Sequence, residues 1–421
     1  MRPVRFIHCS DLHIDTPFRG IGEVHPDLRD LLHQSTFRSF AGIVEYAISE
    51  SVDCVLIAGD IFDSAERSLQ AQIKFRDGLK LLSDAGIRSF IVYGNHDPLD
   101  GWSATLTWPE GVTIFGGKEV ESHALERDGN TIAMIHGISF ATRDVYENLS
   151  LRFERTEPDV PAIGLLHANV GKNTGHLPYA PASLQDLSSR GMDYWALGHL
   201  HQHQILRESH PAIVYPGNSQ ALNPGEMGPK GCCLVTLHPD GACDIRFVPT
   251  DTVRYAGECA DVSDCTTHDE VIAAVRDRCE GIAEGMEGRH AVIRLALAGR
   301  TPLHRELCRE GSIVDLTAEI REVFEGRRPW IWIEKLLLKT TGIRDIDALR
   351  KGEHFIADII RLYDELAGDG EDLWRDIRKA GEPLFSQWQG RRYLEAPSRE
   401  ELLRIAEEAR NWTLDLLAEE E

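Results

Sequence analysis

The chain has 421 residues, 42% hydrophobic and 27% charged, which suits a globular protein of two or three domains rather than a disordered or membrane-embedded one. Nine cysteines without a CxxC pair predict reduced thiols in the cytoplasm, and the short apolar run before Asp11 predicts no signal peptide. The net charge of −23 argues against broad, metal-free binding of nucleic acid, although metal ions and a local arginine cluster can still focus positive potential.

Residues 1–250 alternate between strand-like and helix-like patterns. Helices are expected over 27–49 and 68–84, and Gly86 is a candidate C-cap for the second. Strands follow more closely over 134–248, with a hairpin-like turn at 238–241. This first region is predicted to be a layered α/β domain.

The composition changes after residue 250. Residues 251–335 read as strand, helix and strand, which predicts a small α/β unit ending in an edge strand over 329–333. Residues 336–421 are almost wholly helical in pattern. We therefore expect three regions, 1–250, 251–335 and 336–421.

Five strand-like runs in the first region each precede a polar cluster. The runs are 4–7, 52–58, 90–93, 163–166 and 195–197. The clusters contain Asp11 and His13; Asp60 and Asp63; Asn95, His96 and Asp97; His167; and His199 and His201. Carboxylate, amide and imidazole ligands at five strand ends predict a metal site.

The ligand types indicate how metal would bind. Asp11 and His13 lie two residues apart, so both can turn toward one ion at a strand end. Asp60 is the natural bridge, because a carboxylate has two oxygens and imidazole cannot bridge. With Asn95, His167, His199 and His201, the set makes two sites of four ligands with Asp60 shared. Oxygen and nitrogen ligands without thiolate favour Mn²⁺ or Fe²⁺, leave Zn²⁺ open and argue against Mg²⁺.

Two such ions would clamp a phosphate, lower the pKa of bound water and stabilise the leaving oxygen. His96 is the candidate general acid, and its neighbour Asp97 is expected to fix its tautomer. Asp63 is expected to hold a ligand imidazole, and Arg19 is a candidate phosphate contact.

The order D-x-H, G-D-x-x-D, G-N-H-D, H, G-H-x-H resembles that of the calcineurin-like metallophosphoesterases. Within that superfamily, HCSDLHIDTPFRG (residues 8–20) and YPGNS (215–219), followed by Lys230 and Gly231, resemble the SbcD-type DNA repair exonucleases, most closely their YhaO branch. The resemblance covers residues 1–250 strongly and the small α/β unit loosely.

The resemblance implies a four-layer α/β/β/α sandwich with a small α/β cap and a helical C-terminal region. It implies two divalent ions, Mn²⁺ above all, exonuclease and endonuclease cleavage of DNA, and an SMC/SbcC-like ATPase partner; many relatives are homodimers.

The resemblance also implies roles for individual residues. Asp11, His13, Asp60 and His201 would hold one ion, and Asp60, Asn95, His167 and His199 the other. His96 would act on the scissile phosphate. Some relatives carry His where Asp63 stands, so the chain departs from them there.

Two other functions are consistent with the same residues. A two-metal site also serves phosphodiesterases and phosphatases of small esters or nucleotides, and a scaffold could retain a degenerate site. The additional residues beyond the first region favour the nuclease over the small-ester enzyme. The complete ligand set argues against the scaffold.

Overall fold

The computed structural model describes residues 2–16, 18, 26–63, 68–171, 177–343, 346–352, 355–367, 375, 379, 381–382 and 397–418. They belong to two compact units. The first comprises Met1–Ala256, Ile282–Ile293 and Gly326–Glu334, and the second comprises Gly257–Gly281, Arg294–Glu325 and Lys335–Glu421.

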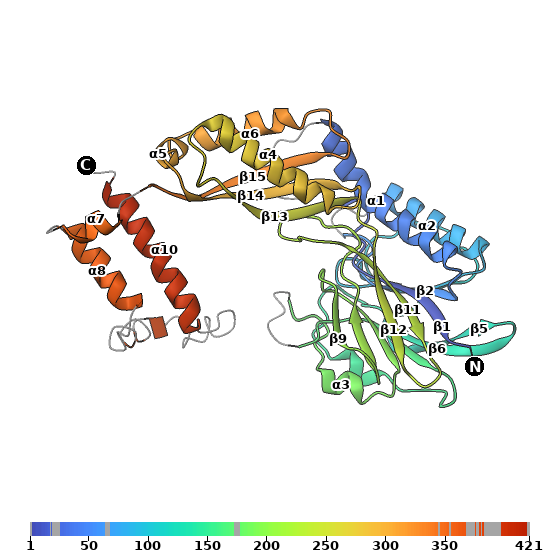
Figure 1. Cartoon of the computed structure of the whole chain (residues 1–421). Helices are drawn as coiled ribbons and strands as arrows, with labels where there is room; N and C mark the ends of the chain where they lie inside the picture. Colours follow the sequence, from blue (N-terminus) through green and yellow to red (C-terminus); the bar gives the residue numbers. More distant parts are fainter. Residues whose placement is uncertain are drawn as a thin grey trace. The chain divides into compact units, whose positions relative to one another are not determined.

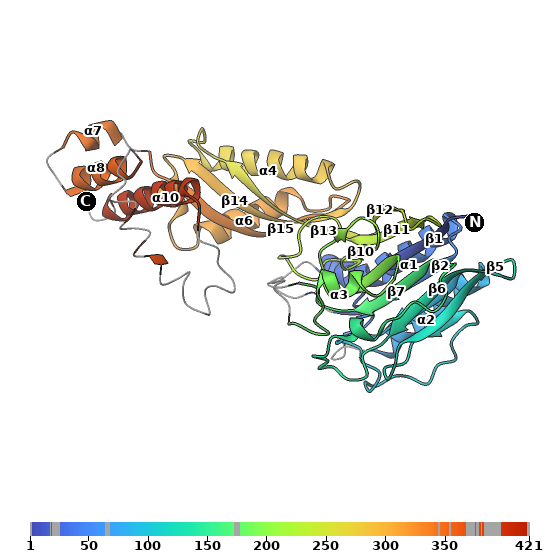
Figure 2. The same ribbon diagram turned by 90° about the horizontal axis from the view of Figure 1, so that it is seen from below.

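The first unit contains two six-stranded sheets (Figures 1 and 2). One sheet has the order β12-β11-β1-β2-β3-β4. Its strands are β1 (Val4–Cys9), β2 (Cys54–Ala58), β3 (Arg88–Val92), β4 (Val112–Ile114), β11 (Gly231–Leu237) and β12 (Cys243–Pro249). Strands β1 to β4 are parallel, whereas β11 runs antiparallel to β1 and to β12. The pairing of Leu237 with Cys243 confirms the hairpin turn predicted at 238–241.

The second sheet has the order β5-β6-β7-β8-β10-β9. Its strands are β5 (Glu121–Arg127), β6 (Asn130–Ile138), β7 (Ala162–His167), β8 (Tyr194–Gly198), β9 (Gln204–Arg207) and β10 (Ala212–Tyr215). The four central strands are parallel, and the two edge strands run antiparallel to their neighbours.

Alternation along the strands separates the core into layers. Phe6 and Leu56 point between the sheets, where they pack with Ile163 and Leu165 of the second sheet. Their neighbours in sequence, including Ile7 and Ile57, point to the opposite face of the first sheet.

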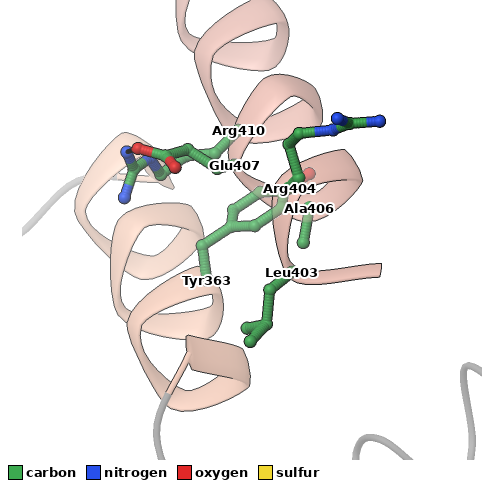
Figure 3. A pocket seen from close by; sticks show the side chains of 6 residues that line it. All are labelled: Tyr363, Leu403, Arg404, Ala406, Glu407 and Arg410. Carbon is green, nitrogen blue, oxygen red and sulfur yellow. Dashed lines mark hydrogen bonds and ion pairs between the residues drawn. The ribbon is translucent and has the colours of Figure 1, made fainter. Parts of the chain in front are cut away.

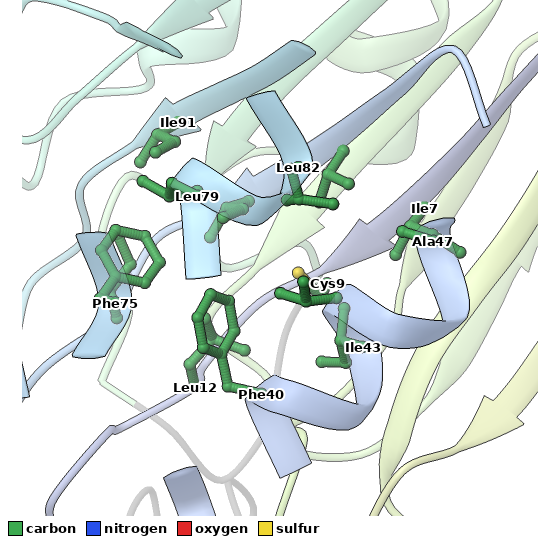
Figure 4. Close-up of a cluster of buried hydrophobic side chains, with 14 of the residues drawn as sticks. Ile7, Cys9, Leu12, Phe40, Ile43, Ala47, Phe75, Leu79, Leu82 and Ile91 are labelled. Atoms are coloured by element: carbon green, nitrogen blue, oxygen red, sulfur yellow. The ribbon is translucent and has the colours of Figure 1, made fainter. Parts of the chain in front are cut away.

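On that face lie the helices α1 (Pro26–Ser49) and α2 (Leu69–Asp84), close to the ranges predicted for them. Figure 4 shows Phe40 and Ile43 of α1 and Phe75 and Leu79 of α2 gathered over this face. Ser68 caps α2, because its hydroxyl accepts a hydrogen bond from the amide of Ala71 at 2.9 Å. Gly86 follows the C-cap residue Ala85 with a φ of 76°, as expected of a residue that ends a helix.

The outer face of the second sheet carries the fourth layer. Trp195 and Leu197 of β8 pack there with Leu149 of the 3₁₀ helix η1 (Leu149–Arg152) and Leu187 of α3 (Leu184–Ser188). The Trp195 indole donates to the carbonyl of Leu187 at 3.0 Å. The first unit is thus the predicted α/β sandwich, with a thin outer layer on this side.

A three-stranded sheet has the order β13 (Val253–Asp261), β14 (His290–Arg300) and β15 (Ile331–Thr341). The helices of this region are α4 (His268–Glu284), α5 (His304–Leu307) and α6 (Ser312–Val323). Strand β15 runs to Thr341, past residue 336, where we expected helix to begin. Its buried positions Ile331, Ile333 and Leu336 keep it extended as an edge strand.

Among the described residues of the second unit, the helices α7 (Ile346–Arg350), α8 (Phe355–Ala367) and α10 (Arg399–Ala418) follow. Helices α8 and α10 pack together around a pocket of about 330 Å³ (Figure 3). Tyr363 of α8 points toward α10 in this pocket, and Glu407 pairs with Arg410 at 3.3 Å. Over the described ranges, no helix is both long enough and apolar enough to cross a membrane.

Candidate metal centre

The topology gathers the predicted ligand segments at one end of the sandwich. Strands β1, β2 and β3 are parallel neighbours in one sheet, and β7 and β8 are parallel neighbours in the other. Because parallel strands end at the same edge of a sheet, the segments after them meet. Asp11, Asp60 and Asn95 follow the first three strands, His167 ends β7 and His199 follows β8.

Close approach of these segments requires glycine at specific positions. A Cβ on Gly198 would overlap the carbonyl oxygen of Ala58, which belongs to the other sheet. A Cβ on Gly59 would lie 2.6 Å from Nδ1 of His167. The absence of side chains at Gly198 and Gly59 therefore lets the ends of β2, β7 and β8 approach one another.

Four predicted ligands have left-handed backbone conformations. The φ angles are 49° at Asp11, 42° at His13, 51° at Asp60 and 107° at His199. Non-glycine residues rarely adopt these values, which cost roughly 1–3 kcal/mol each and cluster at functional sites. Packing and backbone hydrogen bonds maintain them here: the amide of Asp11 donates to Gly59 at 3.0 Å and that of His13 to Asp60 at 3.1 Å.

One group of possible metal ligands consists of Asp11, His13 and His201, whose ligand atoms all lie within 4.8 Å of one another. The Nε2 atoms of His13 and His201 are 3.3 Å apart, and Nε2 of His201 lies 4.0 Å from Oδ1 of Asp11. The Asp11 carboxylate is fixed by the Ser10 hydroxyl at 2.5 Å and the amide of His199 at 3.1 Å.

A second group consists of Asp11, Asp60 and His167. Nε2 of His167 lies 3.4 Å from Oδ2 of Asp60 and 3.0 Å from Oδ1 of Asn95. The imidazole ring of His199 lies beside that of His167, with centroids 5.3 Å apart. Asp60 is thus close to both Asp11 and His167, the position that a bridging carboxylate needs.

The protonation of His167 indicates that a cation fits the second group. Its Nδ1 lies 2.9 Å from the carbonyl oxygen of Ala58, which can only accept, so Nδ1 carries the proton. Burial lowers the pKa of His167 well below its usual range, so the ring is neutral and Nε2 holds a lone pair. That lone pair faces oxygen atoms of Asp60 and Asn95, an arrangement that is favourable around a cation, which would also hold Asp60 in its ionised form. The same logic makes Nδ1 the ligand atom of His199, whose Nε2 donates to the carbonyl of Leu177 at 2.9 Å.

Burial also acts on the other groups at the site. It raises the pKa of Asp11 and raises that of Asp60 well above the usual range, and it lowers the pKa of His13 well below it. Each shift disfavours the charged form of a buried group. A bound divalent cation would reverse this preference for the carboxylates, and the neutral imidazoles are already in the form that binds metal.

The third group, His13, Asp63 and His96, places the candidate acid beside the others. Nδ1 of His96 lies 3.5 Å from Oδ1 of Asp63. Burial opposes charge on His96, but the hydrogen bond that His96 donates to Asp63 and the charges of Asp60, Asp63 and Asp97 outweigh it and raise the pKa of His96 to about 9.

The two carboxylates near His96 have partners other than those expected. Asp97 accepts the amides of Ile61 at 2.7 Å and Gly94 at 2.8 Å, so it holds the loops that carry Asp60 and Asn95. Asp63, expected beside a ligand imidazole, lies in one group with His13 and also contacts His96, which was not expected. The physical reason is side-chain direction: Asp97 points back toward the chain that follows β2.

Glu226 is a functional candidate that we did not find in the sequence. Its Oε1 accepts a hydrogen bond from Nδ1 of His201 at 2.9 Å, which makes Nε2, the nitrogen that faces Asp11 and His13, the metal-binding atom of His201. Burial opposes its charge, but the hydrogen bond from His201 and those of the backbone and Asn218 outweigh it and lower the pKa of Glu226 to about 2. The signal that could have found it is its position between YPGNS and Lys230, which we had already singled out.

The structure thus brings the seven predicted metal ligands and the two carboxylates near His96 into one cluster of side chains, together with Glu226. Arg19, the candidate phosphate contact, lies outside the described residues. The arrangement is suited to phosphoester chemistry that uses more than one cation.

Comparison with known proteins agrees with this class. Residues 4–203 match the family "Calcineurin-like phosphoesterase", and residues 258–341 match "Metallophosphoesterase YhaO, middle domain". The chain is 32% identical over 404 residues to "Uncharacterized metallophosphoesterase YhaO" of Bacillus subtilis, covering 96% of this chain and 95% of that protein. This protein is a calcineurin-like metallophosphoesterase, and it belongs to the YhaO family.

More distant relatives carry the names of DNA repair proteins and nucleases. The chain is 28% identical over 241 residues to "DNA double-strand break repair protein Mre11" of Aeropyrum pernix, covering 55% of this chain and 57% of that protein. It is 23% identical over 270 residues to a component of the nuclease SbcCD of Bacillus subtilis, covering 56% of this chain and 67% of that protein.

Proposed function

We propose that this protein is a metal-dependent DNA exonuclease and endonuclease that hydrolyses phosphodiester bonds in DNA repair, as the nuclease subunit of an assembly with an SMC/SbcC-like ATPase. The observation that carries the proposal is the convergence of Asp11, Asp60 and His167, in which a lone pair of neutral His167 faces a carboxylate. The names of the Mre11 and SbcCD relatives support DNA as the substrate.

Asp11, His13, Asp60 and His201 would hold one divalent ion, and Asp60, Asn95, His167 and His199 the other, with Mn²⁺ the metal we propose. When bound, the pair would polarise the phosphate, activate water and stabilise the leaving oxygen. The chain itself fixes which atoms would face the ions. The carbonyls of Ala58 and Leu177 and the carboxylate of Glu226 each accept a hydrogen bond from the ring nitrogen of a ligand imidazole that points away from the ions.

His96 would deliver the proton to the leaving oxygen. Asp63 lies on its Nδ1 side, so the opposite nitrogen, Nε2, is the one directed to the substrate. The side chain is 33% exposed, unlike the buried ligand His167, so a substrate can reach it. Asp97 would act indirectly, through the loops whose amides it accepts.

The helices of the second unit are where we propose that the ATPase binds. Helices α8 and α10 pair with each other and still expose large apolar side chains. These exposed residues are Phe355, Leu362, Ile405, Trp412 and Leu416. Exposed apolar groups on a helix pair are typical of a helix-binding surface. The nine free cysteines support a reducing compartment, the cytoplasm, and a homodimer stays a prediction from the family resemblance.

Nuclease activity can be tested with the purified chain, Mn²⁺, end-labelled duplex DNA and a chromogenic phosphodiester. We expect both to be cleaved, and His96→Ala to slow DNA cleavage about 10²–10⁴-fold. The matched control is His238→Ala, which removes another histidine paired with an aspartate, Asp244 at 2.9 Å, on the β11–β12 hairpin.

Two results would contradict the proposal. Cleavage of the small ester alone, with DNA intact even when an SMC-type ATPase is supplied, would assign the protein to the small-phosphoester class. Unchanged activity in Asp60→Asn would show that the measured hydrolysis does not depend on this site, and would favour a scaffold with a degenerate site.

A further inference from the structure

We propose that Tyr146 is a stacking platform for a nucleobase of the substrate, next to the metal centre. This inference rests on the proposed function and deepens it. It identifies part of the DNA-contacting surface of an acidic chain and assigns it to an aromatic ring in the loop 141–148.

The platform is the outer end of a row of three rings. Tyr179 lies edge-on to the proposed ligand His199, with centroids 6.0 Å apart and planes at 75°. Tyr146 then stacks on Tyr179, with centroids 5.7 Å apart and planes at 29°. Tyr179 is only 5% exposed whereas Tyr146 is 63% exposed, so the row leads from the metal centre to solvent.

The row is held in place before any substrate binds. The amide of Ala180 donates to the carbonyl of Val145 at 2.7 Å, which ties the loop of Tyr146 to the segment of Tyr179. The Tyr179 hydroxyl contacts Oδ1 of Asp144 at 3.3 Å, and its backbone carbonyl accepts from Asn169 at 2.9 Å. These bonds fix Tyr179 and the backbone beside Tyr146, so the ring on which Tyr146 stacks is already in place when a flat ligand binds.

A nucleobase is the flat ligand that the position favours. The metal centre would hold the scissile phosphate, and Tyr146 is two ring-to-ring contacts from His199, within reach of a base on a neighbouring nucleotide. Stacking of a base on an aromatic side chain contributes about 1–3 kcal/mol and does not depend on sequence. It also does not depend on a basic surface, which matters for a chain with a net charge of −23. The exposed loop carries one cation, Arg143, whose charge acts on Tyr179, and two acidic residues, Asp144 and Glu147.

The test pairs a change in the protein with a change in the substrate. The substrates are single-stranded oligonucleotides in which one abasic residue is moved through the terminal positions at each end, so that the backbone charge stays constant. For the wild type, we expect one position at which loss of the base lowers kcat/KM about 5- to 150-fold, the equivalent of about 1–3 kcal/mol. In Tyr146→Ala the ratio of kcat/KM for the intact strand to kcat/KM for the abasic strand falls to about 1, because only the intact strand is cleaved more slowly than by the wild type. Tyr146→Phe keeps the wild-type ratio.

A purely structural role would slow cleavage of intact and abasic strands alike, and that result, or an unchanged ratio in Tyr146→Ala, overturns the inference. A second experiment does not depend on hydrolysis. The binding of labelled intact and abasic strands is measured by fluorescence anisotropy with a chelator present, so that no DNA is cleaved. If the wild type binds the intact strand better and Tyr146→Ala does not, the platform stands even where DNA is not cleaved and the proposed function fails. If both proteins bind both strands equally, the platform is refuted.

Discussion

Replacing Glu226 with glutamine should weaken metal binding, although no atom of Glu226 belongs to the proposed ligand set. Each of its oxygens accepts two hydrogen bonds. Oε1 accepts from Nδ1 of His201 at 2.9 Å and Nδ2 of Asn223 at 2.8 Å, and Oε2 accepts from Nδ2 of Asn218 at 2.7 Å and the amide of Leu222 at 2.8 Å.

A glutamine amide has one oxygen and one NH₂ group, so in either orientation the NH₂ group faces two N–H donors that an oxygen of Glu226 accepts in the wild type, and it cannot accept their hydrogen bonds. If it faces His201, the favoured tautomer places the proton on Nε2 and removes the lone pair that would bind metal. Loss of a hydrogen bond to a charged group costs about 1.5–3 kcal/mol. Removal of such an orienting partner typically lowers metal affinity about 10- to 100-fold.

The assay is calorimetric titration of metal-free protein with Mn²⁺. We expect one of two binding steps to weaken about 10- to 100-fold in Glu226→Gln while the other changes little. The control is Glu121→Gln, which also removes a carboxylate that contacts a histidine, His123 at 3.5 Å, and a backbone amide, Gly116 at 3.1 Å, at a sheet edge. Equal affinities in Glu226→Gln and the wild type would refute the argument that Glu226 sets the tautomer of His201.

Further predictions concern packing and pH. In urea unfolding, Gly198→Ala should lower the free energy of unfolding by about 3 kcal/mol or more, because the new Cβ would overlap the Ala58 carbonyl. The control is Gly281→Ala, in helix α4 with open space around it, which should raise the free energy of unfolding by up to about 1 kcal/mol. Equal effects of the two substitutions would contradict the close approach of the sheets. Burial lowers the pKa of His8 to about 3, so below pH 6.5 the unfolded chain binds a proton that the folded chain does not, and stability falls as pH falls. Between pH 8 and pH 5, in metal-free protein, His8 should lower the free energy of unfolding by about 2 kcal/mol, and His8→Gln should lack this contribution. The same pH dependence of unfolding in His8→Gln and the wild type would refute the argument that His8 is buried in its neutral form.

The layers of the sandwich could be predicted because their residues carry local patterns. Runs such as 52–58 are apolar at nearly every position, as is typical of a strand that is buried on both faces. The ligand clusters follow such runs directly. Because parallel neighbouring strands end at the same edge of a sheet, the order β1-β2-β3 places Asp11, Asp60 and Asn95 close together. The prediction ended strand β15 too early, because the second half of the strand, Lys335–Thr341, mixes lysine with apolar residues in a pattern that a helix also allows.

The orienting partners could not be predicted, because they depend on side-chain direction and on distant segments. Asp97 is adjacent to His96 in sequence, yet its carboxylate turns to the amides of Ile61 and Gly94. Glu226 lies 25 residues from His201 in a stretch without strand or helix pattern. Only the folded loop reveals that the two form a pair.

The most direct test of the two-metal centre is anomalous diffraction at the manganese edge from crystals soaked in Mn²⁺. We expect two peaks roughly 3.5–4 Å apart, with the Asp60 carboxylate contacting both, and with Nε2 of His167 and Nε2 of His201 on different ions. A single peak, or two peaks of which Asp60 contacts only one, would contradict the shared-carboxylate centre from which the proposed chemistry follows.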